Sequence, residues 1–116
     1  MSEPLAESSF VTFEEFSKVK FVMGKIISAE SIPGMKKVLK ATVDIGTEKR
    51  QIAVGVAQYY KPEEVVGRTV VVCANLEPKK IGGIISSGML LSADGPEGRP
   101  IFLTASEDVV PGAQIR

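Results

Sequence analysis

The side chains that most often carry out catalysis are scarce in this sequence. It contains no histidine and a single cysteine, Cys73, so imidazole-activated nucleophiles, histidine general bases, an intrachain disulfide and histidine- or cysteine-ligated zinc are all excluded. Cys73 lies within an apolar run, where a cysteine usually acts as a small core residue. The acidic pairs Glu14-Glu15 and Glu63-Glu64 stand at the starts of predicted helices, where they complement the helix dipole. We therefore predict no enzymatic activity, no cofactor and no metal site.

Basic residues supply the other chemistry in the chain. The formal net charge is 0 over 116 residues, but residues 18–80 hold twelve Lys/Arg against six Asp/Glu. Residues 1–17 hold four acids and no base, and residues 81–116 hold two bases against four acids. A basic centre between acidic ends suits a face that binds polyanions, because clustered Lys and Arg contact phosphates. A mixed, solvated surface is the alternative interpretation of the same pattern.

The elements that must position these charges are mainly strands. Alternating apolar residues and apolar runs predict strands over residues 18–30, 39–45, 50–56, 68–74, 89–93 and 101–104. Thr12 and Glu15 form a capping-box pattern that begins a short helix ending near Ser17. A second short helix is predicted over residues 61–67, with Pro62 at its first position. Residues 75–88 are predicted to be a loop, and a tail begins at residue 111.

The order of these elements favours an all-β fold. Three successive strands, a helix between the third and fourth strands and a closing pair match the five-stranded Greek-key OB barrel. An SH3-like barrel is the main competitor, but it does not normally place a helix there. We therefore predict a five-stranded OB-fold barrel with a short N-terminal helix, a short helix between strands 3 and 4 and a C-terminal strand extension. Residues 1–9 are expected to be a flexible N-terminus, and residues 10–116 to form one domain.

Two further absences bear on location. The first residues carry neither a basic segment nor an apolar segment of the kind found in secretory signals, and no apolar run is long enough for a membrane helix. We therefore expect a cytoplasmic protein with no membrane partner.

The predicted barrel brings separate basic segments to one side. OB barrels usually bind through strands two and three, framed by the loops that join strands one to two and four to five. Lys36 and Lys37 are expected in the first loop, and Lys79 and Lys80 in the second. The residues that converge on this side are Lys36, Lys37, Lys40, Lys49, Arg50, Gln51, Lys79 and Lys80. This convergence favours nucleic-acid binding over a solvated surface.

Few residues are suited to stacking on bases. The chain has no Trp, and its two tyrosines, Tyr59 and Tyr60, follow strand three instead of lying on the binding face. This favours recognition of the backbone shape of a folded RNA over base stacking. Gly83 and Gly88 have the spacing of a P-loop, but Met89 stands where that motif needs a lysine. Met89 is therefore expected to pack in the core or against a base or sugar.

Residues 75–91, NLEPKKIGGIISSGMLL, resemble the signature of the tRNA-binding domain. That domain occurs at the C-terminus of bacterial methionyl-tRNA synthetases, in stand-alone dimeric tRNA-binding proteins and in the precursor of endothelial monocyte-activating polypeptide II. CsaA-type export chaperones are more distant relatives. Residues 13–21, 43–46, 49–52 and 59–68 also match, so the resemblance runs from about residue 10 to the C-terminus.

The resemblance implies an OB-fold homodimer that binds the outer corner of L-shaped tRNA by shape. In this family the N-terminal segment and the strands after the barrel form the dimer interface. The RNA contacts it implies are Arg50, Gln51, Asn75, Lys79, Lys80, Ser86 and Met89. Lys79 and Lys80 would neutralise phosphates, whereas Asn75 and Ser86 would order the loop or hydrogen-bond to the backbone. We expect a non-catalytic tRNA-binding module, either stand-alone or a beta-subunit-like partner of methionyl-tRNA synthetase.

The sequence departs from the family pattern at several positions. Met35-Lys36-Lys37-Val38 stands where the family commonly has Ala-Asp-Lys-Leu, and Val54 stands where serine is frequent. Glu77 and Gly82 occupy positions that often carry basic residues, which predicts weaker phosphate binding that Lys36 partly offsets. The alternative functions are a CsaA-like protein-binding export chaperone and an assembly scaffold for a synthetase complex.

Overall fold

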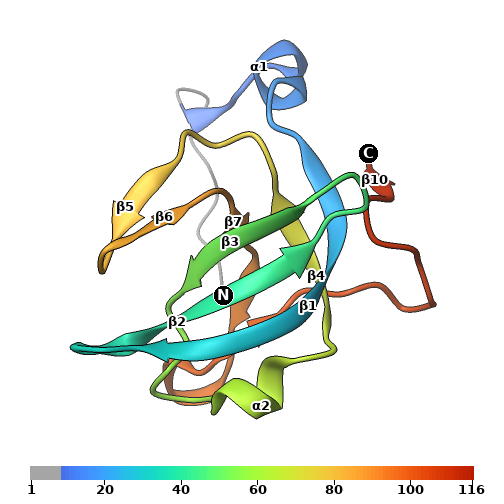
Figure 1. Ribbon diagram of the computed structural model, residues 1–116. Helices are drawn as coiled ribbons and strands as arrows, with labels where there is room; N and C mark the ends of the chain where they lie inside the picture. The colour runs from blue at the N-terminus through green and yellow to red at the C-terminus, as the bar shows by residue number, and fades with distance from the viewer. Residues whose placement is uncertain (1–8) are drawn as a thin grey trace.

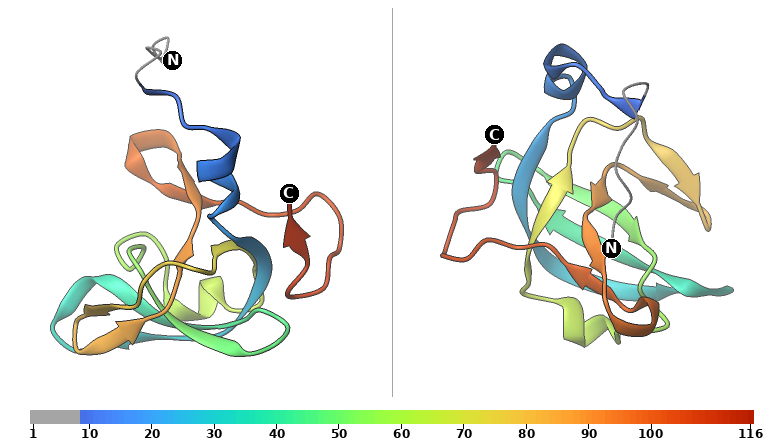
Figure 2. Two further views of the ribbon diagram at one scale, coloured as in Figure 1. Left: turned by 90° about the horizontal axis from the view of Figure 1, so that it is seen from above. Right: turned by 180° about the vertical axis from the view of Figure 1, so that it is seen from behind.

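The computed structural model describes residues 9–116 as a curled antiparallel sheet with short helices at its ends (Figures 1 and 2). Its elements are α1 (Phe13–Ser17), β1 (Phe21–Ile32), β2 (Met35–Asp44), β3 (Lys49–Val54), α2 (Pro62–Val65), β4 (Thr69–Cys73), β5 (Lys79–Ile81), β6 (Ile84–Ser86), β7 (Met89–Leu90), β8 (Ser92–Asp94), η2 (Pro96–Gly98), β9 (Pro100–Phe102) and β10 (Gln114–Ile115). The predicted flexible N-terminus, residues 1–9, lies outside the described residues except for Ser9. No helix in this part of the chain is long and apolar enough to cross a membrane.

The main sheet has the strand order β3-β2-β1-β4-β7, and β10 adds to β1. The sheet curls until β3 approaches the chain ahead of β7, where the backbone N–H of Ser87 donates to the carbonyl of Gln51 at 2.8 Å. No ladder joins β3 to β7 within residues 9–116, so the barrel is partly open. This order, with α2 between β3 and β4, confirms the predicted OB-like fold.

The alternation of apolar and polar residues explains why β2 has one face toward the core and one face toward solvent. Leu39, Ala41 and Val43 are buried in the core, whereas Lys40 and Thr42 point outward between them. The core continues into strands β1, β3 and β4 and into α2. One side of the β2–β3 pair therefore faces away from the core.

Gly24 lets β1 bend across this core. A Cβ atom at residue 24 would lie 2.8 Å from a methyl group of Val43 and 2.9 Å from one of Val72. A β-bulge follows between Ile26 and Ser28. Close packing on both sides of the strand therefore requires a glycine at this position.

The first helix begins as predicted but stays outside the core. The backbone N–H of Glu15 donates to the Thr12 hydroxyl at 3.0 Å, and the N–H of Thr12 donates to the Glu15 carboxylate at 3.1 Å. This is the complete capping box. Phe13 is nevertheless 81% exposed and Phe16 51% exposed, because α1 stands off the end of the barrel (Figure 1).

Three sequence predictions about loops were wrong. Residues 75–88 contain the β5–β6 hairpin, whose turn uses positive φ at Gly82 and Gly83. Lys36 and Lys37 lie in β2, because β1 and β2 continue to a tight turn at residues 33–34. The predicted tail contains β10, which pairs with the start of β1.

Candidate nucleic-acid interface

Outward-facing residues of β2 and β3 form the floor of the candidate site. Lys40 lies opposite Ala53, and Thr42 lies opposite Gln51. Lys40 forms an ion pair with Glu30 of β1, so part of its charge is neutralised within the sheet. The side chain of Ala53 is a single methyl group, so it projects little from the centre of this floor. The floor is therefore polar and shallow, with little charge of its own.

The β5–β6 hairpin is hydrogen-bonded to the edge of β3. The backbone N–H of Ala53 donates to the hydroxyl of Ser86 at 2.9 Å, and the side-chain amide of Gln51 donates to the carbonyl of Ile85 at 3.0 Å. Ser86 is only 5% exposed, so Ser86 and Gln51 act as positioning residues. On β5, the exposed Lys79 lies opposite Ser86 and the exposed Lys80 lies opposite Ile85. The hairpin therefore holds two lysines beside the floor.

The β1–β2 hairpin approaches the same side of the molecule (Figures 1 and 2). The Met35 side chain lies over Gly82, since a Cβ atom at residue 82 would be 3.0 Å from the Met35 Cγ. Lys36 and Lys37 follow Met35 and are exposed. The tips of the two hairpins thus meet. Two departures from the family pattern, Met35 and Gly82, fit each other in space.

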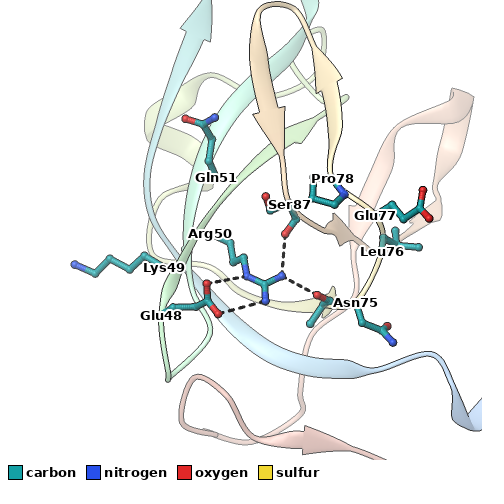
Figure 3. A pocket seen from close by; sticks show the side chains of 10 residues that line it. Glu48, Lys49, Arg50, Gln51, Asn75, Leu76, Glu77, Pro78 and Ser87 are labelled. Carbon is teal, nitrogen blue, oxygen red and sulfur yellow. Dashed lines mark hydrogen bonds and ion pairs between the residues drawn. The ribbon is translucent and has the colours of Figure 1, made fainter.

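Arg50 points inward and is held by the protein (Figure 3). Its parity in β3 is that of the buried Ile52. The Arg50 guanidinium donates to the carbonyl of Ala74 at 2.7 Å and to that of Ser87 at 3.2 Å. It also contacts the Glu48 carboxylate, with Nε 3.2 Å from the nearer oxygen. Arg50 therefore joins β3, the end of β4 and the segment before β7, and its group is not free on the surface.

Asn75 is also a positioning residue. Its side-chain oxygen accepts from the N–H of Lys20 at 2.7 Å, and its side-chain amide donates to the carbonyl of Lys18 at 2.6 Å. These bonds fasten the chain after β4 to the start of β1. Of the two roles that the resemblance left open for Asn75 and Ser86, the structure supplies the ordering role.

Met89 is 47% exposed on β7, opposite the buried Cys73. Its side chain is therefore not part of the core, and the alternative of packing against a base or sugar stays a prediction. Lys49 lies exposed at the start of β3, opposite Asp44.

A shallow depression of about 490 Å³ separates the start of β3 from the chain after β4 (Figure 3). Lys49, Asn75 and Leu76 line it together with Glu48 and Glu77. The two carboxylates offset the charge of Lys49 and of the adjacent arginine. The depression therefore has little net charge, and the positive charge is concentrated on the hairpins.

The candidate basic residues differ in whether an acidic side chain already neutralises their charge. Across residues 9–116 there are two ion pairs, and these use Lys40 and Arg50. The candidate lysines that form no ion pair in this part of the chain are Lys36, Lys37, Lys49, Lys79 and Lys80. Their ammonium groups are exposed, so they are available to an anionic partner.

The profile of a domain family described as "Putative tRNA binding domain" matches residues 21–114. The chain belongs to the tRNA-binding domain family. The matched residues include the β2–β3 floor and both hairpins, so the candidate interface lies wholly within the family's common part.

Relatives of this tRNA-binding domain include much longer proteins. A methionine–tRNA ligase of Thermotoga maritima is 44% identical over 110 residues, which make up 95% of this chain but 17% of that protein. The chain therefore spans about a sixth of the length of this relative.

Two solved structures have the same fold. A MetRS related protein from Pyrococcus horikoshii has a TM-score of 0.86 and 35% identity, and the match covers 93% of this chain and 99% of that chain. The chaperone CsaA from Bacillus anthracis has a TM-score of 0.83, with coverage of 93% and 100%, but only 23% identity. The second likeness concerns the fold alone.

Proposed function

We propose that this chain is a non-catalytic module that binds folded tRNA by the shape of its backbone. The observation that carries the proposal is the group of lysines on the two meeting hairpins, which have no acidic partner within residues 9–116. Membership of the tRNA-binding domain family supports the choice of tRNA over other polyanions. The floor between the hairpins carries no aromatic residue, which favours backbone contacts over base readout.

Phosphate neutralisation is the physical source of the affinity. Lysines bound to phosphates release counterions that were condensed on the RNA, and this gain is independent of sequence. Two hairpins that meet at Met35 and Gly82 keep the backbone segments that carry the lysines close together. A group of charges on one braced surface favours a matching arrangement of phosphates, such as the outer corner of tRNA, over a flexible strand.

The biological role that we propose is to raise the local concentration of tRNA for a synthetase. The homologous segment is part of the methionine–tRNA ligase in Thermotoga maritima. A separate module that associates with such an enzyme, as a beta subunit would, adds affinity through effective concentration. We propose the cytoplasm as its location, because tRNA is used there.

We further propose that the module is a homodimer joined through α1 and the C-terminal strand. Phe13 and Phe16 are exposed and line an apolar groove of about 360 Å³ that also includes Phe21 and Ile115. Val110 on the same C-terminal segment is 72% exposed. Apolar patches of this kind mark protein interfaces, and the interface implied by the family resemblance uses the same two segments.

Competition binding tests the proposed function. We expect labelled bulk tRNA to be displaced by unlabelled tRNA but much less by a single-stranded RNA of equal length. Different tRNA species are expected to compete about equally. Equal competition by single-stranded RNA would contradict recognition of shape.

The CsaA-like chaperone alternative is favoured by one observation, the apolar groove beside α1. The same competition experiment includes an unfolded polypeptide for this reason. Displacement of tRNA by tRNA only supports the RNA-binding function, whereas tighter binding of the polypeptide than of tRNA supports the chaperone.

A further inference from the structure

The two adjacent tyrosines have opposite environments. Tyr60 is 4% exposed and donates from its hydroxyl to the carbonyl of Pro100 at 2.8 Å. Tyr59 is 43% exposed, and its hydroxyl forms no hydrogen bond within residues 9–116. Tyr60 therefore anchors the segment between β3 and α2 to the core, and the ring of Tyr59 stays at the surface on a fixed backbone.

Tyr59 lines a depression of about 560 Å³ that also includes Met35, Lys36 and Lys61. Neither lysine forms an ion pair in the described part of the chain. Glu64 is the acidic residue of this depression, and its carboxylate accepts from the backbone N–H of Lys61 at 2.8 Å. The depression therefore combines a flat aromatic ring with two ammonium groups and a single carboxylate that already caps α2.

This depression adjoins the basic hairpins. Met35 contributes to both regions, because its side chain lies over Gly82 of the β5–β6 turn and also lines the depression. Lys36 follows it and lines the depression as well. Met35 and Lys36 therefore connect the β5–β6 turn to the depression that holds Tyr59.

A ring beside ammonium groups suits a nucleotide, since bases stack on aromatic side chains and lysines bind the adjoining phosphates. We propose that Tyr59 stacks on an unpaired base of the bound RNA while Lys36 and Lys61 contact the phosphates on either side. This inference rests on the proposed RNA-binding function and adds a base contact to it. The sequence pattern places Tyr59 after strand three, away from the predicted binding face; the long β1–β2 hairpin brings the interface to Tyr59.

Substitutions of Tyr59 test the stacking contact by equilibrium binding of bulk folded tRNA. Y59F keeps the ring and is expected to bind like the unchanged protein. Y59L keeps an apolar side chain but removes the flat ring, and loss of a stacked base lowers affinity by about 5- to 100-fold. The salt dependence of binding is expected to stay the same in Y59L. It should weaken in K61Q by about 0.7 to 0.9 in the slope of log affinity against log salt.

Tyrosine fluorescence gives a second readout that a general structural defect would not reproduce. The chain has two tyrosines and no tryptophan, and Tyr60 is buried. Quenching of the emission by added tRNA is expected in the unchanged protein and is expected to be largely lost in Y59F. Thermal unfolding of Y59F and Y59L should match that of the unchanged protein, because the Tyr59 side chain is not part of the core.

The outcomes separate this inference from the proposed function. If tRNA binds and the Lys79 and Lys80 charges are required, but Y59L binds like Y59F, the stacking contact is refuted and the RNA-binding function stands. Equal quenching in Y59F and the unchanged protein would refute it as well. If tRNA does not bind to the unchanged protein, the proposed function itself is wrong.

Discussion

The two ends of this molecule expose different chemistry. At one end, the β1–β2 and β5–β6 hairpins carry lysines whose ammonium groups form no ion pair within residues 9–116. At the other end, α1 and β10 expose phenylalanine and isoleucine side chains around an apolar groove. Water solvates exposed ammonium groups well but disfavours exposed apolar area. We therefore expect the lysine end to bind its partner transiently, and the apolar end to be covered permanently by a second copy of the chain.

The two ends also differ in how their surfaces are held. Side-chain hydrogen bonds from β3 and β6 fix the β5–β6 hairpin, whereas α1 owes its start to a local capping box and buries no residue. Rigid placement favours a selective contact between charges. The helix α1, which would pack its apolar side chains against a second copy of the chain, needs no such hydrogen bonds to the barrel.

The largest effect is expected from the double variant K79E/K80E. Each substitution removes an attraction of about 1 kcal/mol and adds a similar repulsion, so affinity for tRNA should fall by about 100- to 1000-fold at low salt. Filter binding or fluorescence anisotropy measures the change. The control K18E/K25E reverses two charges far from the turns of both hairpins, since Lys18 precedes β1 and Lys25 pairs with Asp44 at the open end of the β1–β2 ladder. It should have a much smaller effect. Equal losses in the two variants would mean that net charge, not the hairpin, determines binding.

The apolar end is tested by F13E, which places a charge on the most exposed part of α1. Truncation of a packed interface residue costs about 1 kcal/mol or more, and each dimer contains two copies, so the dimer should dissociate at least about 30-fold more readily. Analytical ultracentrifugation measures this. Thermal stability of the monomer should not change, because Phe13 is outside the core. A monomeric unchanged protein would contradict the proposed dimer.

The bracing of the hairpin is tested by S86A. The substitution leaves the part-buried N–H of Ala53 without its acceptor, which should lower the free energy of unfolding by about 1 to 3 kcal/mol. The affinity for tRNA should fall as well, because Lys79 and Lys80 lose their fixed position. S87A is the matched control, since Ser87 uses its backbone N–H rather than its hydroxyl to contact Gln51. Equal free energies of unfolding for S86A and S87A in urea denaturation would show that the Ser86 hydroxyl does not stabilise the hairpin.

The smallest effect is expected where the hairpins meet. Gly82 has φ +58° and lies against Met35, so G82A should destabilise the protein by about 1 to 2 kcal/mol. Adding M35A to G82A makes room for the new methyl group. The double variant should recover the stability lost to the steric contact, but not the stability lost to the strained backbone at residue 82. Chemical denaturation of the single and double variants measures the coupling. Strictly additive changes would show that the two side chains do not interact.

Much of the fold could be predicted from local patterns. The alternation of β2 and the capping box of Thr12 and Glu15 each depend on neighbouring residues, and both are confirmed. The β5–β6 hairpin was missed because strands of three residues, KKI and IIS, are too short to show a period. The pairing of β10 with β1 was missed because it depends on an available sheet edge and not on its own two residues.

The candidate site was predicted less completely. Arg50 was grouped with the surface cations, although its parity with Ile52 was visible in the sequence and indicates an inward position. The hydrogen bonds of Asn75 and Ser86 join residues far apart in the chain, such as Asn75 with Lys18, so no local pattern could distinguish positioning from RNA contact. The meeting of Met35 with Gly82 depends on the lengths of two hairpins, which the sequence left undetermined.

The salt dependence of tRNA binding tests most directly whether hairpin lysines bind phosphates. Log affinity should fall linearly with log salt, and four phosphates neutralised by the hairpin residues Lys36, Lys37, Lys79 and Lys80 would give a slope of about −2.8 to −3.6. In K79E/K80E the slope should be shallower by about 1.4 to 1.8, while dimer dissociation should not become easier as salt rises. A tRNA affinity that does not change with salt, or a slope that is the same in K79E/K80E, would contradict phosphate binding by these lysines.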